Sequence, residues 1–339
     1  MTTAQTLSPV RCAVIGGGAW GTAIADLLAR NGHAVVLWAR EADVVAAVNA
    51  EHTNPRFLPG AALSPALTAT GDMTAALTDR DLVVYAAPSH VLRPVVAAGL
   101  GALRADCVLA VATKGIERET LALMTDVVHD VLPMHPVVAI SGPSFAAEVA
   151  AGQPTAIVAA SVDAAAAALV QRAMSSATFR VYTTDDVTGV ELGGALKNVM
   201  AVATGILDGL GLGYNPRAAL LTRGLAEMIR LGVALGARAE TFAGLAGLGD
   251  LVLTCTGALS RNRAVGVALG QGQTLDEALA GKDSVAEGVL NTQSARALAA
   301  RAGIEMPIVE STYRILFAGQ APRDAAADLM TRGLRSERD

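Results

Sequence analysis

Apolar positions follow two different patterns along the chain. From Arg11 to about Tyr182, short runs rich in β-branched residues alternate with alanine-rich stretches of helical character. This alternation is typical of a parallel sheet with crossover helices, and runs that are apolar at every position suit strands covered on both faces. The predicted strands are RCAVIG (11–16), AVVLWA (34–39), DLVVYAAP (81–88), CVLAVAT (107–113), VVAIS (137–141), TAIVAA (155–160) and FRVYT (179–183).

From Thr188 onward, strand-like runs become scarce and helical periodicity dominates, for example at 187–210 and 216–236. We therefore predict an α/β domain with a doubly wound parallel sheet over residues 1–186, followed by an all-α domain over 187–339. The glycine-rich segment 244–263 is predicted to be a long loop between helices. Long loops in compact domains are often functional.

Length and composition agree with two domains and favour small-molecule chemistry. The 339 residues exceed what one core usually organises, and the net charge of -5 comes from interspersed acidic and basic residues. We expect neither a basic face for nucleic acid nor a polybasic membrane anchor. Apolar runs are broken by charges such as Asp163 before they could span a bilayer, so no transmembrane segment is predicted.

Cysteine and histidine usage indicates a reduced compartment and no metal. Cys12, Cys107 and Cys255 are far apart and form no C-x-x-C pair. The first ten residues lack a positive region followed by an apolar run, so no signal peptide is expected and a cytoplasmic location is predicted. No zinc-type spacing is present among His33, His52, His90, His129 and His135.

A glycine motif links the first predicted strand to the first helix. Gly16, Gly18 and Gly21 form G-x-G-x-x-G between RCAVIG and TAIADLLARNG. In a Rossmann-like domain the first glycine permits the tight turn, the second lets the backbone approach a pyrophosphate, and the third allows close helix packing. The helix N-terminus then offers free N–H groups to the anion. The alternative is an ordinary glycine-rich turn, but the flanking strand and helix favour dinucleotide binding.

The residue at the end of the second predicted strand helps to indicate whether NAD or NADP is bound. NAD-preferring folds usually carry an acidic residue there for the ribose hydroxyls. Here the strand ends in Arg40, whose guanidinium could bind a 2′-phosphate bidentately, which favours NADP. In the alternative, Arg40 is solvated and Glu41 takes the ribose.

Polar and small residues follow the later strands at the sheet edge where ligands of open parallel sheets bind. Lys114 follows one strand and should point into this crevice, although a surface loop lysine is the common alternative. Another strand ends in GPSFA, whose Gly142 and Ser144 could act as donors to a ligand.

Lys197 is unusual because it lies inside an otherwise apolar helical run, VELGGALKNVMAVATG. Gly193 and Gly194 weaken this helix and leave room for something to pack closely. Burial would lower the pKa of Lys197 and make it a general base or acid. The alternative is a lysine that snorkels to the surface.

Further polar groups occur later in the chain. Asp250 could orient or pair with the buried lysine, or could merely cap a helix or turn. Glu287 could accept a hydroxyl hydrogen bond, although sequence alone does not separate it from other glutamates. A donor-rich cluster that could clamp a phosphate, or could simply be solvated, consists of Ser260, Arg261 and Asn262.

Seven blocks in order resemble bacterial-type NAD(P)-dependent glycerol-3-phosphate dehydrogenases from Arg11 to about Leu329. The blocks are GGGAWGTA, ATKGIE, ISGPSFA, ELGGALKNV, GLGDLVLTCT, SRNR and VAEG. A small departure is Ala19, where relatives often carry serine. Backbone N–H groups bind the phosphate there, so we expect little loss.

The resemblance implies roles for individual residues. Lys197 would be the proton donor and acceptor, Thr254 would lie near the reacting group, and Lys114 would contact both cofactor and substrate. The substrate site would contain Lys114, Gly142, Ser144, Lys197, Asp250, Ser260, Arg261 and Asn262. The dinucleotide contacts would be Gly16, Gly18, Ala19, Trp20, Gly21, Arg40, Lys114, Ala146, Arg261, Val285 and Glu287.

The implied reaction is the reversible reduction of dihydroxyacetone phosphate to sn-glycerol 3-phosphate by NADPH or NADH, which supplies phospholipid synthesis. A homodimer is expected from the family's habit. Two alternatives remain at this stage. One is a related dehydrogenase of a 3-hydroxyacid or 6-phosphogluconate type, and the other is a catalytically silent nucleotide sensor.

Overall fold

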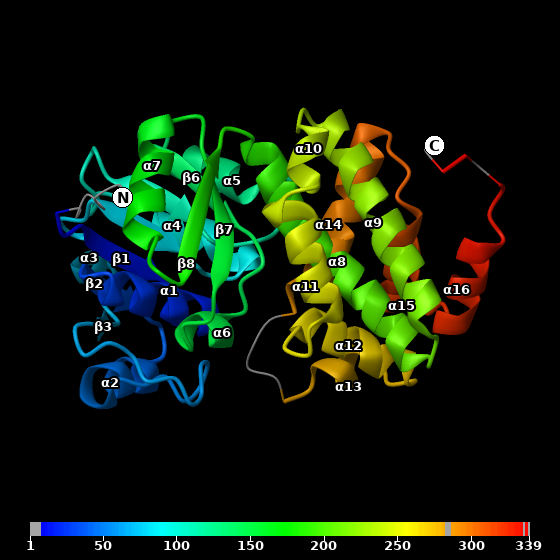
Figure 1. The fold of residues 1–339 in the computed structure, drawn as a ribbon, viewed down its shortest axis with the longest axis horizontal. Helices are drawn as coiled ribbons and strands as arrows, with labels where there is room; N and C mark the ends of the chain where they lie inside the picture. The colour runs from blue at the N-terminus through cyan, green and yellow to red at the C-terminus, as the bar shows by residue number, and fades with distance from the viewer. Residues whose placement is uncertain (1–7, 282–285, 335, 338–339) are drawn as a thin grey trace.

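The computed structural model of the chain describes residues 8–281, 286–334 and 336–337. It has two lobes side by side, with the sheet in the N-terminal lobe and helices in the C-terminal lobe (Figure 1). The sheet ends at Thr184, and the first helix of the second lobe begins at Val187. The change in hydrophobic pattern therefore coincides with the change in architecture.

The N-terminal lobe is built on an eight-stranded sheet with the order β3-β2-β1-β4-β5-β6-β7-β8. All seven predicted strands are present, and the additional strand β3 has only three residues, too few to stand out as a run. The strands are β1 (Arg11–Ile15), β2 (Ala34–Trp38), β3 (Thr68–Thr70), β4 (Leu82–Tyr85), β5 (Val108–Val111), β6 (Val137–Ser141), β7 (Thr155–Ala160) and β8 (Phe179–Thr184).

The sheet is parallel, as expected, except at one pair of strands. β6 and β7 are antiparallel, whereas the other neighbouring strands are parallel. The connection from β6 to β7 contains only the short helix α6 (Ala146–Ala150). The chain turns back along β6 instead of crossing over it. The next connection contains the longer α7 (Ala164–Met174), and β8 is again parallel to β7.

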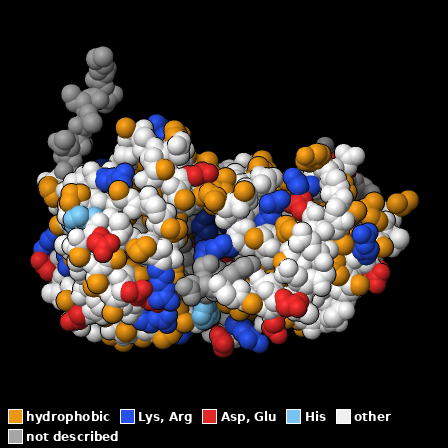
Figure 2. Space-filling view, turned by 90° about the horizontal axis from the view of Figure 1, so that it is seen from below, with side chains coloured by type: hydrophobic (Ala, Val, Ile, Leu, Met, Phe, Trp, Pro, Cys, Tyr) orange, Lys and Arg blue, Asp and Glu red, His pale blue; other side chains and the backbone are white. Residues whose placement is uncertain are grey.

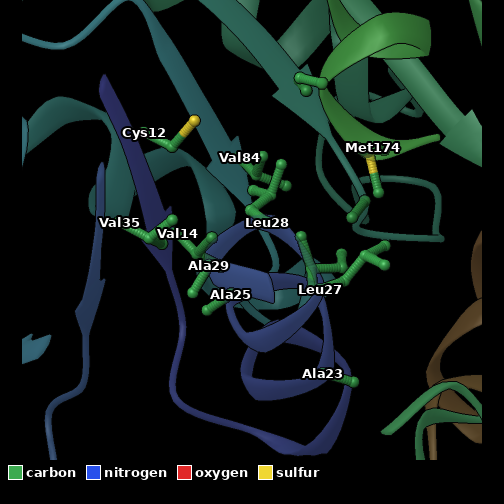
Figure 3. Close-up of a cluster of buried hydrophobic side chains, with 14 of the residues drawn as sticks. Cys12, Val14, Ala23, Ala25, Leu27, Leu28, Ala29, Val35, Val84 and Met174 are labelled. Carbon is green, nitrogen blue, oxygen red and sulfur yellow. The ribbon is translucent and has the colours of Figure 1, made fainter. Parts of the chain in front are cut away.

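Helices cover both faces of the sheet, as in a doubly wound fold. The remaining helices of this lobe are α1 (Ala19–Arg30), α2 (Ala42–Glu51), α3 (Met73–Leu77), η1 (Ser89–Val91), α4 (Leu92–Ala97) and α5 (Met124–Val131). On one face Val14 packs with Leu28 of α1 (Figure 3). Its neighbour Ile15 belongs to the opposite core, with residues of α4 and α5. Alternate side chains of β1 therefore pack into two separate hydrophobic cores, one on each face of the sheet.

The C-terminal lobe consists of helices around α8, and no strand occurs in its described residues. Its helices are α8 (Val187–Gly209), α9 (Tyr214–Ala234), α10 (Ala239–Phe242), the π-helical turn η2 (Leu245–Gly249), α11 (Asp250–Thr256), α12 (Arg261–Gly270), α13 (Leu275–Leu279), α14 (Glu287–Ala302), α15 (Pro307–Phe317) and α16 (Pro322–Met330). α8 is long and apolar enough to cross a bilayer, but 94% of its most apolar stretch is buried inside the protein. It is therefore the core helix of this lobe.

The prediction of a long loop over 244–263 is wrong. Most of the segment is helical in η2 and α11, and only residues 257–260 connect α11 to α12. Its glycines permit close packing rather than a flexible loop. A Cβ on Gly247 would lie 2.1 Å from the carbonyl oxygen of Phe242, so only glycine fits this turn. π-helical turns of this kind are frequent at functional sites.

α8 and α12 touch through their backbones. A Cβ on Gly205 would lie 2.1 Å from the carbonyl oxygen of Arg263, and one on Gly266 would lie 2.1 Å from that of Val202. Gly209 and Gly270 make equally close approaches one turn further on. Only helices without side chains at these positions can pack at this distance.

Candidate active site

The glycine turn after β1 has the geometry that its spacing predicts. Gly16 has a φ of +126°, and a Cβ there would lie 2.8 Å from the carbonyl oxygen of Ala86. A Cβ on Gly21 would lie 1.9 Å from the carbonyl oxygen of Gly16. Gly18 differs because a Cβ there would meet nothing within 4 Å. The first and third glycines thus serve the fold, and the second leaves the backbone open to a ligand.

The N-terminus of α1 beside this turn offers free donors. The first backbone bond of the helix runs from Thr22 N to Gly18 O. Within the described residues, the amides of Ala19, Trp20 and Gly21 have no hydrogen-bond partner, and the first turn carries no acidic side chain. Ala146, at the start of α6, packs on the same core cluster as Ala19 and Trp20. These residues fit the pyrophosphate of a dinucleotide.

Arg40 follows β2, as expected, and its side chain is 84% exposed. Its guanidinium donates to Glu41 Oε1 at 2.8 Å, so the two residues that compete for the ribose end of the cofactor form an ion pair. The Glu41 side chain is only 16% exposed, so the guanidinium is the solvent-facing partner of this pair. Arg40 therefore remains available to a nucleotide.

A continuous set of contacts leads from the glycine turn to Lys114. Ala86, which packs against Gly16, follows β4, and Ser89 lies in the next turn. A Cβ on Gly115 would lie 2.5 Å from Cβ of Ser89, so the loops after β4 and β5 are in direct contact. The structure therefore places Lys114 at the carboxyl edge of the sheet, one loop away from the nucleotide-binding turn.

Lys114 and Lys197 bind the same carboxylate. Lys114 Nζ donates to Asp250 Oδ2 at 2.6 Å, and Lys197 Nζ donates to Asp250 Oδ1 at 2.6 Å. The three side chains come from the loop after β5, from α8 and from α11, so this contact joins the two lobes. Asp250 is 1% exposed and Lys197 is 8% exposed. Lys197 is thus buried against a partner and does not snorkel to the surface.

Electrostatics within this cluster favour proton transfer at Lys197. Burial lowers the pKa of Lys197 to about 8, although Asp250 acts to raise it. Burial alone would raise the pKa of the Asp250 carboxyl, but the two ammonium groups hold it below its usual value. Thr254 Oγ1 accepts from Lys197 Nζ at 2.8 Å. Asp250 and Thr254 thereby orient the amine.

The glycines of α8 make room for this cluster. A Cβ on Gly193 would lie 2.4 Å from the carbonyl oxygen of Ala246 in η2. A Cβ on Gly194 would lie 2.8 Å from Ser141 Oγ and 3.3 Å from Cδ of Lys114. Gly193 therefore admits the turn that carries Asp250, and Gly194 admits the stem of Lys114.

The loop after β6 lines the same region. Gly142 has a φ of +140° and its carbonyl oxygen accepts from Lys114 Nζ at 3.2 Å. Ser144 donates its hydroxyl to the same oxygen at 3.1 Å. Both residues were expected to be donors to a ligand. In this structure the Gly142 carbonyl is an acceptor and the Ser144 hydroxyl is already engaged.

The start of α12 lies beside Lys197. Asn262 Nδ2 donates to Oδ1 of Asn198, the residue after Lys197, at 2.9 Å. Ser260 caps α12 by accepting from Arg263 N. The amides of Arg261 and Asn262 have no partner in the described part of the chain, and no described carboxylate lies within salt-bridge distance of Arg261. This helix start thus offers two N–H groups and a guanidinium to an anion.

Glu287 connects the lobes on the other side of the cleft. Its carboxylate accepts from Ser89 N at 3.0 Å and from Ser89 Oγ at 2.5 Å. The next residue, Gly288, donates its amide to Asn262 Oδ1 at 2.9 Å. The predicted cofactor contact Val285 lies outside the described residues. Figure 2 shows Lys and Arg side chains in the hollow between the two lobes.

Several residues at the site carry no signal in the sequence that predicts their role. Ser89 directly follows the predicted strand 81–88, and no motif marks it as a site residue. Asn198 directly follows Lys197, and its role as the partner of Asn262 depends on tertiary contact. Asn291 accepts from Ile116 N at 3.4 Å and donates to Lys114 O at 3.5 Å. No spacing signal in the sequence marks Asn291.

The fold and the site together define a nicotinamide-dependent oxidoreductase. A glycine turn suited to a dinucleotide lies at the same edge of the sheet as Lys114, which shares Asp250 with a buried amine of lowered pKa, and an anion-binding helix start lies beside that amine. The chain belongs to the NAD-dependent glycerol-3-phosphate dehydrogenase family. The N-terminal part of that family matches residues 11–167 and the C-terminal part matches residues 186–327.

Individual relatives agree with this assignment. A glycerol-3-phosphate dehydrogenase [NAD(P)+] of Geobacter sulfurreducens is 56% identical, with 97% of this chain and 99% of that protein covered. The protein of the same name from Syntrophotalea carbinolica is 54% identical over 96% of this chain and 99% of its own length. The crystal structure of glycerol-3-phosphate dehydrogenase from Coxiella burnetii has a TM-score of 0.92 and 42% identity, and covers 96% of this chain and 99% of that chain.

Proposed function

We propose that this enzyme reduces dihydroxyacetone phosphate reversibly to sn-glycerol 3-phosphate, and thereby supplies glycerophospholipid synthesis. Residues 1–186 form the NAD(P)-binding part and residues 187–339 the substrate-binding and catalytic part. The observation that carries this proposal is the buried Lys114–Asp250–Lys197 contact, which brings a proton donor from the helical lobe to the nucleotide edge of the sheet.

The nucleotide would be held by Gly16, Gly18, Ala19, Trp20, Gly21, Arg40, Lys114, Ala146, Arg261, Val285 and Glu287. When bound, its reduced nicotinamide supplies the hydride for the carbonyl carbon. The free amides of α1 bind the phosphates, and Gly18 lets them approach the backbone. Arg40 binds the 2′-phosphate of NADPH, and Glu41 accepts from the ribose hydroxyls of NADH.

Lys197 transfers the proton. Its ammonium gives a proton to the carbonyl oxygen of the substrate, and its neutral amine takes the proton back in the oxidation direction. Asp250 and Thr254 hold Nζ in place throughout. Lys114, with its own ammonium bound to Asp250 and Gly142, stabilises the negative charge that develops on the oxygen.

Arg261 and the start of α12 bind the phosphate of the substrate. The guanidinium offers a fork of donors, and the amides of Arg261 and Asn262 add two more. The side-chain amide of Asn262 is taken up by Asn198 and Gly288, so it orients this helix start rather than gripping the phosphate itself. Ser260 contributes in the same way, as the cap of α12. Gly142 and Ser144 close the other side of the site.

The cellular setting is part of the same proposal. The homodimer rests on the family resemblance, whereas the cytoplasmic location and action on small molecules alone, without a metal and without binding nucleic acid or membrane, rest on the composition and motifs of the sequence. Size-exclusion chromatography with light scattering measures the oligomeric state. A monomer at assay concentration contradicts this part of the proposal.

An absorbance assay with dihydroxyacetone phosphate and each reduced cofactor tests the function. We expect cofactor oxidation that depends on this substrate, with NADPH used at least as well as NADH. Unphosphorylated dihydroxyacetone is the matched control and should react far more slowly, because Arg261 then has no anion to bind. Activity with 6-phosphogluconate or a 3-hydroxyacid instead would support a related dehydrogenase, and cofactor binding without turnover would support a silent sensor.

A further inference from the structure

α8 carries a second buried ionisable side chain, Glu191, which the reaction does not use. Its carboxylate accepts a hydrogen bond from Thr125 N at 2.8 Å and another from the Thr125 hydroxyl. Thr125 lies in the first turn of α5, whose N-cap residue Leu123 has no side chain able to cap the helix. Glu191 therefore caps α5 from a different lobe.

α5 is joined to Lys114 by a short and closed loop. The chain leaves β5 at Val111, passes Lys114, and reaches α5 at Met124. Ile116 and Leu123 form a β-bridge, and Glu117 N donates to Ala122 O at 2.9 Å, so the two arms of this loop are bonded to each other. A displacement of this loop where it enters α5 is therefore expected to displace Lys114 as well.

The space around the aliphatic part of the Lys114 side chain is small. A cavity of about 10 Å³ is lined by Lys114, Glu191, Ser141 and Gly194, among others. This volume suits about one water molecule, and Ser141 Oγ is buried there without a hydrogen-bond partner among the described residues. A Cβ on Gly194 would lie 3.3 Å from Cδ and 3.4 Å from Cγ of Lys114, so the aliphatic part of this side chain packs against α8, and the position of Nζ depends on the position of the loop.

We infer that Glu191, which lies on the same helix as Lys197, is a positioning residue: through Thr125 and the closed loop, it holds Lys114 in register with Asp250 of α11. The inference rests on the proposed role of Lys114. Glu191 touches neither substrate nor cofactor in this assignment. Its effect on the reaction is entirely geometric.

The chain contains a matched control in Glu227 of α9. This glutamate is also buried, and it accepts from Ile308 N at 2.7 Å and from Val309 N at 3.4 Å in the first turn of α15. Burial raises the pKa of Glu191 and of Glu227 to about 7. The two residues thus perform the same capping chemistry, but α15 carries no residue of the proposed site.

The test compares Glu191→Ala, Glu227→Ala and Lys114→Ala for melting temperature, NADPH affinity by fluorescence, and kcat and KM for dihydroxyacetone phosphate. Both glutamate variants should lose similar stability. Glu191→Ala should lower kcat/KM about tenfold to a hundredfold, because small misplacements of a reacting group have effects of that order. Its NADPH affinity should change less than about twofold, and Glu227→Ala should keep the kinetics of the parent enzyme.

The outcomes separate this inference from the proposed site. Equal kcat/KM for Glu191→Ala and Glu227→Ala, with Lys114→Ala inactive, overturns the positioning role alone. A fully active Lys114→Ala overturns the site. If Glu191→Ala does not fold, Thr125→Val removes one of the two hydrogen bonds with little change in volume and should show a smaller loss of kcat/KM in the same direction. Parent-like kinetics for Thr125→Val would then contradict the inference.

The conservative variant Glu191→Gln distinguishes geometry from charge. The amide oxygen of glutamine can accept from Thr125 N, and its NH₂ group can donate to the Thr125 hydroxyl oxygen. Positioning by hydrogen bonds therefore predicts that Glu191→Gln restores most of the kcat/KM lost in Glu191→Ala. A glutamine variant as slow as the alanine variant would show that charge is required and would refute the inference.

Discussion

The two lobes contribute different kinds of chemical group to the site. The N-terminal lobe uses backbone, since Gly18 leaves space for a ligand and the first turn of α1 leaves its amides unpaired. The C-terminal lobe uses buried side-chain charge, with Lys197 and Asp250 supplied by α8 and α11. Backbone sites tolerate changes of side chain, except at the glycines that keep the backbone accessible, but they do not tolerate changes of chain geometry. Charge sites depend on every partner, because loss of one leaves another charge buried and unpaired.

The largest effect is expected in the C-terminal lobe, whose part of the site consists of buried charged side chains. Lys197→Ala removes the proposed proton donor and should lower kcat about a thousandfold, within the range for loss of general acid–base catalysis. NADPH affinity, measured by fluorescence titration, should stay within about twofold because the glycine turn is untouched. A variant with parent-like kcat would show that another group donates the proton.

The N-terminal lobe, whose part of the site consists of backbone groups, is best tested at two of its glycines. Gly18→Val places a side chain in space that is open in the free protein, so NADPH should bind roughly a hundredfold more weakly without loss of melting temperature. Gly21→Ala instead drives a Cβ into the carbonyl of Gly16 and should cost about 3 kcal/mol of unfolding free energy. Calorimetry and titration of both variants measure the two effects. Equal losses of stability would contradict the separate roles of these glycines.

A smaller effect is expected at Arg40. Arg40→Ala should raise KM for NADPH about tenfold, the loss of roughly one charge-assisted hydrogen-bond pair, and leave KM for NADH almost unchanged. Steady-state kinetics with both cofactors provide the measurement. A uniform change in both KM values would mean that Arg40 does not contact the 2′-phosphate.

The smallest effect is a pH dependence near neutrality. The pKa of Lys197 is lowered to about 8, so the protonated form required for reduction is lost as pH rises through that value. Asp250 stays ionised because its pKa is lowered, and burial raises the pKa of Cys255 to about 12, so neither titrates nearby. The reduction rate at pH 8 should be about half of that at pH 6.5, and the oxidation rate should rise over the same interval. A flat reduction profile to pH 9 would exclude this assignment.

The same comparison explains what the sequence could predict. The glycine turn was predictable because its spacing, strand and helix are local features. The seven longer strands were predictable from apolar runs. β3 was not, because three residues carry no pattern, and the reversal of β7 depends on how the chain turns after α6.

Tertiary contact decides the rest of the site. Lys197 stood out because a charge inside an apolar helix requires a partner, and the same signal could have revealed Glu191. Residues 244–263 were predicted to form a loop because the sequence does not distinguish a glycine in a flexible turn from a glycine in a close helix contact. Asn291 and Ser89 act through loops that only the fold brings together.

The glycine contacts between α8 and α12 have a consequence for substrate size. Lys197 belongs to one of these helices and Arg261 begins the other, and their separation is fixed where main-chain atoms meet at Gly205 and Gly266. Main-chain atoms cannot rotate aside as side chains do. If Lys197 and Arg261 have the proposed roles, the carbonyl-to-phosphate length of the substrates that fit is determined by the rigid contact between α8 and α12, at positions that do not touch the substrate.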